Sequence, residues 1–172
     1  MKTKILAGLI LTAGLATVWA APVRPAPTLE ENVRKALVTI PFLSVFDDLS
    51  YQVENGAVTL SGAVTRPFVK DYAEKAVRQL TGVTAVNDQI EVLPLSAFDD
   101  DIRLRTLRSL SRTSSLYRYF MGTNPSIRIV VKNGRVTLDG VVQNSMDRQL
   151  AFMAANQVHG VFAVINDLRT ER

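Results

Sequence analysis

The sequence ENGAVTLSGAV, residues 54–64, returns 78 residues later as KNGRVTLDGVV, residues 132–142. The two copies stay aligned without a gap as far as Gly82 in the first copy and Gly160 in the second. Repeats that stack into a solenoid need three or more units, so two copies indicate a tandem duplication of one self-contained domain. This repeat decides the organisation of the whole chain.

Each copy contains two predicted strands joined by a tight turn. In the first copy, residues 49–53 and 58–64 alternate apolar and polar side chains, as half-buried strands do. Asn55-Gly56 lies between them, and this dipeptide favours the two-residue hairpin turn in which both residues take a positive φ. Gly62 interrupts the second strand and indicates a bulge or a close approach of another backbone segment.

Helices are predicted on both sides of this hairpin. Thr28 is the expected N-cap of a helix that ends before Pro41. Pro67 suits the first turn of a second helix, and Gly82 suits its left-handed C-terminal position. A third strand follows over residues 83–92, and the resulting order α-β-β-α-β repeats in the second copy.

The chain order constrains the sheet of each copy. The hairpin strands pair antiparallel, and the third strand returns through a right-handed helical crossover that places both helices on the same face. The expected fold class is α+β, with two tandem modules that each cover one face of a three-stranded mixed sheet with two helices. A module of about 70 residues buries only about 60% of its unfolded surface, so we expect the two copies to dock against each other.

The first twenty residues have the layout of a secretory signal peptide. Lys2 and Lys4 precede an apolar run over residues 5–18, and small residues then offer a cleavage site. The alternative is an uncleaved membrane anchor, which needs about 17–25 apolar residues. We expect residues 1–20 to be removed, residues 21–27 to form a Pro-rich linker, and the protein to be periplasmic.

Composition limits the function of such an exported chain. The 172 residues include no cysteine, which excludes disulfides, thiolate metal ligands and a lipid attached through cysteine, so we do not expect a lipoprotein. Loss of Lys2 and Lys4 lowers the net charge from +4 to +2, which does not support nucleic-acid binding. The remaining charge is asymmetric, because residues 28–97 carry a net −3 and residues 98–172 a net +4.

No group of side chains predicts catalysis, a cofactor or a metal site. His159 is the only histidine and stands in a loop before Gly160. Asp99, Asp100 and Asp101 form an acidic run, but carboxylates just ahead of a helix also satisfy its free amide groups and its dipole. We therefore expect a protein that is not an enzyme, uses no cofactor and binds no metal.

The repeated motif resembles a known family. Asn-Gly-x-Val-Thr-Leu-x-Gly-x-Val, a helix with spaced alanines and Gly-Val-x-x-Val resemble the BON domain, named for bacterial OsmY and nodulation proteins. Both copies carry the pattern, as a first domain over residues 28–95 and a second over residues 98–172. The resemblance implies a periplasmic or envelope protein that associates with phospholipid or acts as a chaperone under envelope or osmotic stress, without catalysis.

One polar residue of the family pattern lies in the last strand. It is Asn166 in the second copy and Asp88 in the first. By strand alternation this side chain points to the apolar face, where we expect it to form a structural hydrogen bond to neighbouring backbone.

The second copy departs from the family pattern on its surface. On a predicted helix from Asp101 to Arg112, an apolar arc lies opposite three arginines, and about five extra residues follow before Ile127. The apolar arc consists of Ile102, Leu104, Leu107 and Leu110. The candidate lipid-binding residues are Arg105, Arg108, Arg112, Tyr117, Arg118, Tyr119 and Phe120.

These candidates suit an anionic phospholipid headgroup. Arginine binds phosphate through paired hydrogen bonds, and tyrosine combines an apolar body with a polar tip. The alternative is that Tyr119 and Phe120 pack into the core or against the first module, under a solvated arginine face. A second functional hypothesis is a stress chaperone or protein-interaction module that uses exposed apolar surface around Phe120 and Phe152.

Overall fold

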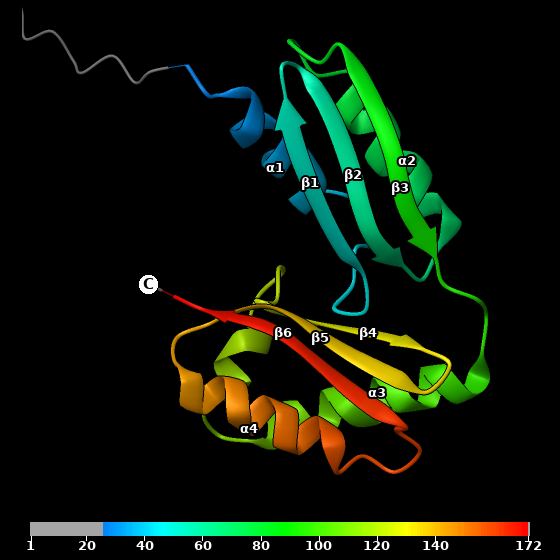
Figure 1. The fold of residues 1–172 in the computed structure, drawn as a ribbon, viewed down its shortest axis with the longest axis vertical. Coiled ribbons are helices and arrows are strands. Elements are labelled where there is room, and N and C mark those ends of the chain that lie inside the picture. Colours follow the sequence, from blue (N-terminus) through cyan, green and yellow to red (C-terminus); the bar gives the residue numbers. More distant parts are fainter. Residues whose placement is uncertain (1–25, 172) are drawn as a thin grey trace, which may run out of the picture.

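A computed structural model describes residues 26–171, in which two modules follow one another along the chain (Figure 1). The predicted signal peptide, residues 1–20, and the start of the linker lie outside the described residues. Within residues 26–171, none of the helices combines the length and apolar content needed to cross a bilayer.

The first module begins at the predicted N-cap. Thr28 Oγ1 accepts a hydrogen bond from the Glu31 amide at 3.2 Å, and Glu31 Oε2 accepts one from the Thr28 amide at 2.9 Å. This reciprocal pair is a capping box, which satisfies two amides that the helix itself leaves free. The elements of the module are α1 (Leu29–Val38), β1 (Asp48–Glu54), β2 (Ala57–Val64), α2 (Pro67–Arg78) and β3 (Ala85–Val92).

The second module repeats this order with a longer first helix. That helix begins at Ala97 rather than near Asp101, because Ser96 caps it by accepting a hydrogen bond from the Asp99 amide. The acidic run therefore lies in the first turn of the helix and not ahead of it. The elements are α3 (Ala97–Arg112), the short 3-10 helix η1 (Tyr117–Phe120), β4 (Ile127–Lys132), β5 (Arg135–Val142), α4 (Ser145–Asn156) and β6 (Ala163–Thr170).

Each module has a three-stranded mixed sheet, in the order β1-β2-β3 or β4-β5-β6. The hairpin strands pair antiparallel, and the third strand pairs parallel with the second. In both modules the two α-helices cover the same face of the sheet (Figure 1). These observations confirm the predicted α+β class and the arrangement of the layers.

The first hairpin turn has the predicted geometry. Asn55 has a φ of +50° and Gly56 a φ of +84°, and their counterparts in the second module have values of +51° and +74°. Gly62 marks a close approach, since a Cβ there would lie 2.3 Å from the carbonyl oxygen of Asp48. Both local signals in the repeated motif are therefore confirmed.

Each module has its own hydrophobic core between the sheet and the helices. In the second module, Ile102 and Leu110 of the apolar arc on α3 are buried. Leu104 is not, and 46% of its surface is exposed. Leu104 belongs to the apolar arc noted in the sequence, but helical periodicity places it nearly opposite Ile102 and Thr106, on the exposed side of α3. There it lines a hollow at the junction together with Phe46 of the first module.

The two modules dock through the loop between α1 and β1. Val45 and Phe46 of this loop pack against the core of the second module. The Val45 carbonyl accepts a hydrogen bond from the Ile129 amide at 2.9 Å, on the free edge of β4. Arg128 Nη1 also donates to the Ser44 carbonyl at 3.1 Å. The expected docking of the two copies is thereby confirmed.

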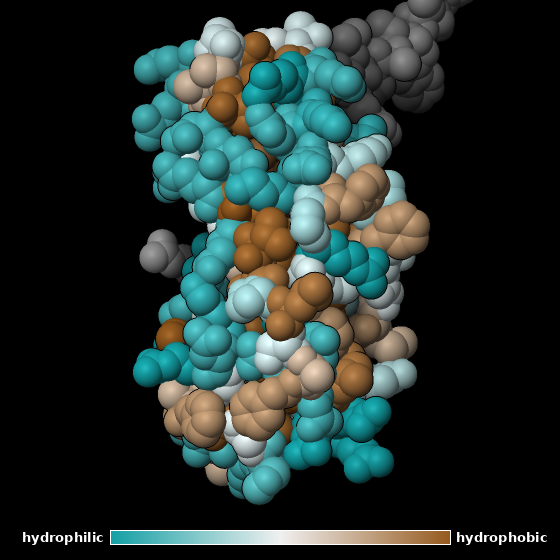
Figure 2. Space-filling model, turned by 90° about the vertical axis from the view of Figure 1, so that its right-hand side faces the viewer, coloured by the Kyte–Doolittle hydropathy of each residue, from teal (hydrophilic) through white to brown (hydrophobic). Residues whose placement is uncertain are grey.

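Charged and apolar side chains surround this junction. Lys132 Nζ lies 2.6 Å from Glu91 Oε1, so an ion pair links β4 to β3. Figure 2 shows apolar side chains gathered at the waist between the modules, on the side where the interdomain linker, residues 93–96, joins β3 to α3 in Figure 1. The junction is therefore held by backbone, ionic and apolar contacts together.

Candidate functional site

The solvent side of α3 carries the three predicted arginines. α3 buries one face in the core, and Arg105, Arg108 and Arg112 are exposed on the other side. Arg105 is paired with Asp101 one turn earlier, with 2.6 Å between Nη2 and Oδ2. Within residues 26–171, neither Arg108 nor Arg112 has a carboxylate partner. Two guanidinium groups are thus available to an external anion.

The insertion after α3 forms η1 and directs its side chains to two sides. Tyr117 is 54% exposed, and Arg118 is exposed beside it. Tyr119 is 6% exposed and belongs to the core, while Phe120 is half-buried against the same core. A 3-10 helix turns about 120° per residue, so Tyr119 points inward where its two predecessors point outward. This position agrees with the alternative that the sequence left open for Tyr119, packing into the core, and it leaves this side chain out of the exposed surface.

A hydrogen-bond network fixes η1 to α4. Tyr119 Oη donates to Asp147 Oδ2 at 2.6 Å and accepts from the Gln143 amide at 2.9 Å. Arg118 Nη2 donates to the same Asp147 oxygen at 2.5 Å. Asn144 caps α4 by accepting from the Asp147 amide at 2.8 Å. The network holds the exposed part of the insertion in one position.

The hydrogen bonds of this network stabilise the ionised form of Asp147, the neutral form of Tyr119 and the charged form of Arg118. Burial raises the pKa of Asp147, but hydrogen bonds from Tyr119 and Arg118 outweigh burial and hold that pKa below its usual value. Burial and the hydrogen bond to Asp147 raise the pKa of Tyr119. The bond to Asp147 likewise raises the pKa of Arg118. A carboxylate, a neutral phenol and a guanidinium therefore coexist at neutral pH.

The exposed residues of α3 and the insertion form what we call the arginine surface. Its cations suit phosphate oxygens, and its tyrosine and methionine offer apolar contact beside them. Met121, which is 57% exposed, was not among the predicted residues although it follows them directly. The arginine surface consists of Arg105, Arg108, Arg112, Tyr117, Arg118 and Met121.

The acidic run at the start of α3 has a structural role. Asp99 is 1% exposed, and its two oxygens accept hydrogen bonds from the amides of Asn133 and Gly134 at 2.9 and 2.8 Å. Asp100 is paired with Arg103 at 2.5 Å. Within the part of the chain that the structure describes, no group of three or more acidic or histidine side chains is placed to hold a metal ion. The first of these carboxylates instead ties α3 to the hairpin turn.

A family model decides the relationship of the chain to known proteins. The model of the BON domain matches residues 26–94 and, separately, residues 99–172. The chain belongs to the BON-domain family. The two matched ranges coincide with the two modules, which are called the first and second BON domains below.

The individual proteins that resemble this chain share less than a third of its sequence. A curated relative is the Osmotically-inducible protein Y of Escherichia coli strain K12, which is 28% identical over 128 residues. The alignment covers 72% of this chain and 62% of that protein, so the chain spans less than two thirds of its relative. A solved structure of the C-terminal domain of CdsD, a structural protein of the type III secretion system of Chlamydia trachomatis, is 13% identical. The structural alignment covers 87% of this chain and 100% of the CdsD domain, with a TM-score of 0.31. A score this low does not establish a shared overall architecture.

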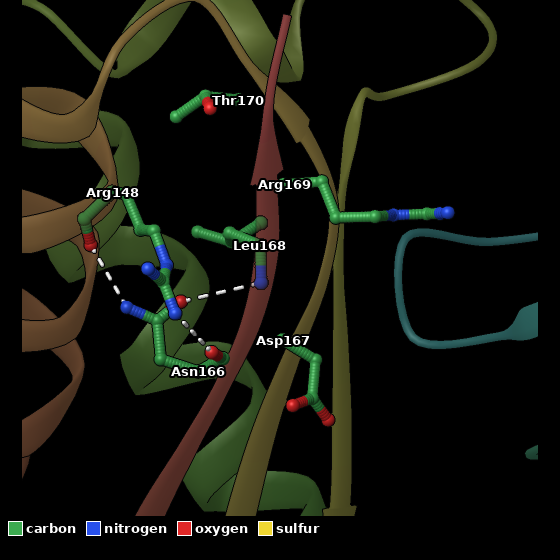
Figure 3. Close-up of a pocket in the computed structure, with 6 residues that line it drawn as sticks. All are labelled: Arg148, Asn166, Asp167, Leu168, Arg169 and Thr170. Carbon is green, nitrogen blue, oxygen red and sulfur yellow. Dashed lines mark hydrogen bonds between the residues drawn. The ribbon is translucent and has the colours of Figure 1, made fainter.

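A hollow of about 530 Å³ lies beside the free edge of β6 in the second BON domain (Figure 3). Asn166 lines it and covers the strand edge, since its Nδ2 donates to the Arg148 carbonyl at 3.0 Å and its Oδ1 accepts from the Leu168 amide at 3.4 Å. Arg148 in turn donates to the Asn166 carbonyl at 3.3 Å. The predicted backbone hydrogen bond of the family asparagine is confirmed. At the hollow, the domain therefore satisfies edge groups of β6 with its own side chains.

The first BON domain covers the edge of β3 with the two equivalent side chains, although their hydrogen bonds differ in part. Asp88 Oδ1 accepts from the Ile90 amide at 2.8 Å. Lys70, which stands where the second domain has Arg148, donates to the Ile90 carbonyl at 2.6 Å and lies 3.6 Å from Asp88. The sequence pattern indicated the strand residue but not the helix cation. The cation reaches the carbonyl group of the strand because its helix packs beside the strand edge.

Proposed function

We propose that this BON-domain protein binds anionic phospholipid peripherally through the arginine surface and thereby supports the integrity of the cell envelope. The observation that carries the proposal is the exposed row of Arg105, Arg108 and Arg112 on α3, followed by exposed side chains of the insertion. Guanidinium groups take phosphate oxygens in pairs. Tyrosine is favoured at the headgroup level of a bilayer because one end of its ring is apolar and the other polar.

Magnitudes make such binding weak and reversible. A basic residue near an anionic surface contributes about 1 kcal/mol, so the four arginines give at most about 4 kcal/mol, which corresponds to roughly millimolar binding. Arg105 and Arg118 already share their charge with Asp101 and Asp147, which lowers this sum. Contact of Tyr117 with the bilayer interface adds to the attraction. Binding should therefore weaken as salt concentration rises.

Vesicle flotation tests the proposal. The purified protein should float with vesicles that contain phosphatidylglycerol and stay behind with vesicles of phosphatidylcholine alone. Charge reversal in Arg105→Glu, Arg108→Glu and Arg112→Glu together should abolish flotation. The matched control reverses Arg34, Lys35 and Lys75, which are exposed on the first domain, and should float normally. Normal flotation of the α3 variant would overturn the proposal.

We also propose that the protein acts in the periplasm, without catalysis, after export. The support is the signal-peptide pattern of residues 1–20, together with the relationship to a protein whose name refers to osmotic induction. Cell fractionation with mass spectrometry of the N-terminus checks it. The expected result is a periplasmic protein that begins at Ala21, and a cytoplasmic protein that retains residues 1–20 would contradict it.

An exposed aromatic cluster favours a second candidate, a chaperone or protein-interaction module. Phe120 and Phe152, the predicted sites for this function, are both half-buried. The first BON domain instead exposes Phe42 by 70% and Phe68 by 48%, with 6.2 Å between their ring centroids. Suppression of client aggregation that survives the arginine reversals but is lost in Phe42→Ser with Phe68→Ser would support this function. Suppression that requires the arginines would exclude it.

A further inference from the structure

A cavity of about 430 Å³ lies at the junction of the two BON domains. It is distinct from the closed edge of β6, and both domains and the linker between them contribute to its walls. Pockets of this size for small molecules form preferentially at domain interfaces. The lining residues are Ser44, Phe46, Thr65, Arg66, Leu95, Asp100, Arg103 and Leu104.

Apolar side chains at this cavity are unusually exposed. Leu95 of the linker is 96% exposed and Leu104 of α3 is 46% exposed. Figure 2 shows apolar side chains at the waist between the two domains, on the face that carries the interdomain linker. Phe46 adds an aromatic wall that is fixed on its other side by the core of the second domain. An apolar ligand here would remove surface from water that neither domain covers.

The cations at the cavity favour an anion. Arg66 is exposed at the start of α2, and no carboxylate pairs with it among residues 26–171. Arg103 is 4% exposed; its Nη2 donates to the Val131 carbonyl at 2.6 Å, and its Nη1 is paired with Asp100. Its buried Nε has no hydrogen-bond partner among the described residues. This Nε is not accessible to solvent, so Arg103 offers no exposed donor, and Arg66 is the cation that an anion in the cavity can reach.

We propose that the junction cavity binds a long-chain carboxylate, such as a free fatty acid. Its alkyl chain lies against Phe46, Leu95 and Leu104, and its carboxylate lies at Arg66. This site does not depend on the arginine surface, so it stands or falls separately from the proposed membrane binding.

The state of the nearest strand edge argues against an extended peptide in this cavity. On β4, the Ile129 amide already donates to the Val45 carbonyl, and the Val131 carbonyl already accepts from Arg103. A peptide that adds to a sheet needs such edge groups for its own backbone. An alkyl chain needs none, and its single charged end matches Arg66, the one cation of the cavity lining without a carboxylate partner within residues 26–171.

Fluorescence of 11-(dansylamino)undecanoic acid, kept below its critical micelle concentration, tests the proposal. The expected result is a saturable rise at one probe per chain, which palmitate displaces. Hexadecanol, which has the same chain length without the carboxylate, should displace it poorly. Absence of saturable binding, or equal displacement by the alcohol, would overturn the proposal.

Variants at exposed positions locate the bound probe. Leu95→Gln with Leu104→Gln removes apolar contact, and Arg66→Glu reverses the charge; each should weaken probe binding by about tenfold. Met146→Gln with Met153→Gln alters two exposed apolar residues of α4 and should leave binding unchanged. The same affinity in the cavity variants, or the same loss in the α4 control, would refute the assignment.

The two sites can be separated in one set of proteins. Arg108→Glu with Arg112→Glu should abolish flotation with anionic vesicles and retain the fluorescent fatty acid. Leu95→Gln with Leu104→Gln should weaken binding of the fluorescent fatty acid and retain flotation with anionic vesicles. Loss of both activities in the arginine variant would mean that the fatty acid lies on the arginine surface, and would overturn the junction site.

Discussion

At the scale of single residues, the buried carboxylate of Asp147 connects the insertion to the rest of the second BON domain. It is 3% exposed and receives hydrogen bonds from Tyr119 and Arg118. Its pKa is lower in the folded protein than its usual value. The ionised group therefore stabilises the fold at neutral pH, and this contribution is lost as the pH falls through the folded-state pKa.

We expect Asp147→Asn to lower the free energy of unfolding by about 2 kcal/mol at neutral pH, because a charged hydrogen-bond acceptor is lost in a buried site. The loss should shrink in acid, where the native carboxyl is itself protonated. Urea unfolding followed by circular dichroism at neutral and acidic pH measures both effects. Asp167→Asn is the control, since Asp167 is exposed on β6. A destabilisation that stays the same at both pH values would contradict the role of the charge.

At the scale of elements, the features that local sequence controls were predictable. The turn at Asn55-Gly56 depends on two residues whose positive φ values are easily adopted, and the N-cap at Thr28 depends on one turn of helix. The inward position of Tyr119 depends on the packing of η1 against α4, and the place of Leu104 beside Phe46 depends on the neighbouring domain. Periodicity along one helix contains neither contact. This is why the sequence indicates the exposed side of α3 for its arginines but leaves the position of Tyr119 open.

The outer edge of β6 is covered by side chains that occupy its free backbone groups, and this protection can be tested directly. Asn166→Val with Arg148→Ala should free the Leu168 amide and the Asn166 carbonyl for pairing with a strand of another molecule. We expect concentration-dependent self-association that the unsubstituted chain does not show. Size-exclusion chromatography with light scattering measures it. Asp167→Val changes the neighbouring residue, which makes none of these bonds, and should not associate.

No increase in mass of the double variant at any concentration would show that the edge needs no protection. A gain of mass in Asp167→Val alone would point to added surface hydrophobicity as the cause. The comparison is informative because both variants add one valine to the same strand. Only one of them removes the hydrogen bonds that cover the edge.

At the scale of the whole molecule, the two BON domains are not equivalent. Residues 28–97 carry a net charge of −3, and residues 98–172 carry +4 together with the whole arginine surface. The first domain contributes the loop whose Val45 and Phe46 cover the β4 edge and part of the second core. We therefore regard the first domain as a support that completes the second, while the cations that face outward belong to the second.

Asp48 of the first domain reports on this docking. Burial raises its pKa, and the nearby carboxylate of Asp139 in the second domain raises it further, while Arg128 and Arg169 act in the opposite direction. Because the folded-state pKa is raised, the contribution of this group to stability is fully present below the unfolded pKa. It is lost as the pH rises through the folded pKa, where an ionised Asp48 must be held beside Asp139.

Asp139→Asn removes the like charge across the junction and should therefore lower the pKa of Asp48. Carbon-detected NMR titration of the Asp48 carboxyl in the whole chain measures the shift. Asp167→Asn, on the same sheet of the second domain but absent from the charges that act on Asp48, should leave the titration unchanged. Since the burial of Asp48 persists in the variant, its pKa should fall only part of the way to the usual value. An unchanged titration in Asp139→Asn would mean that the two domains do not dock in solution through this face.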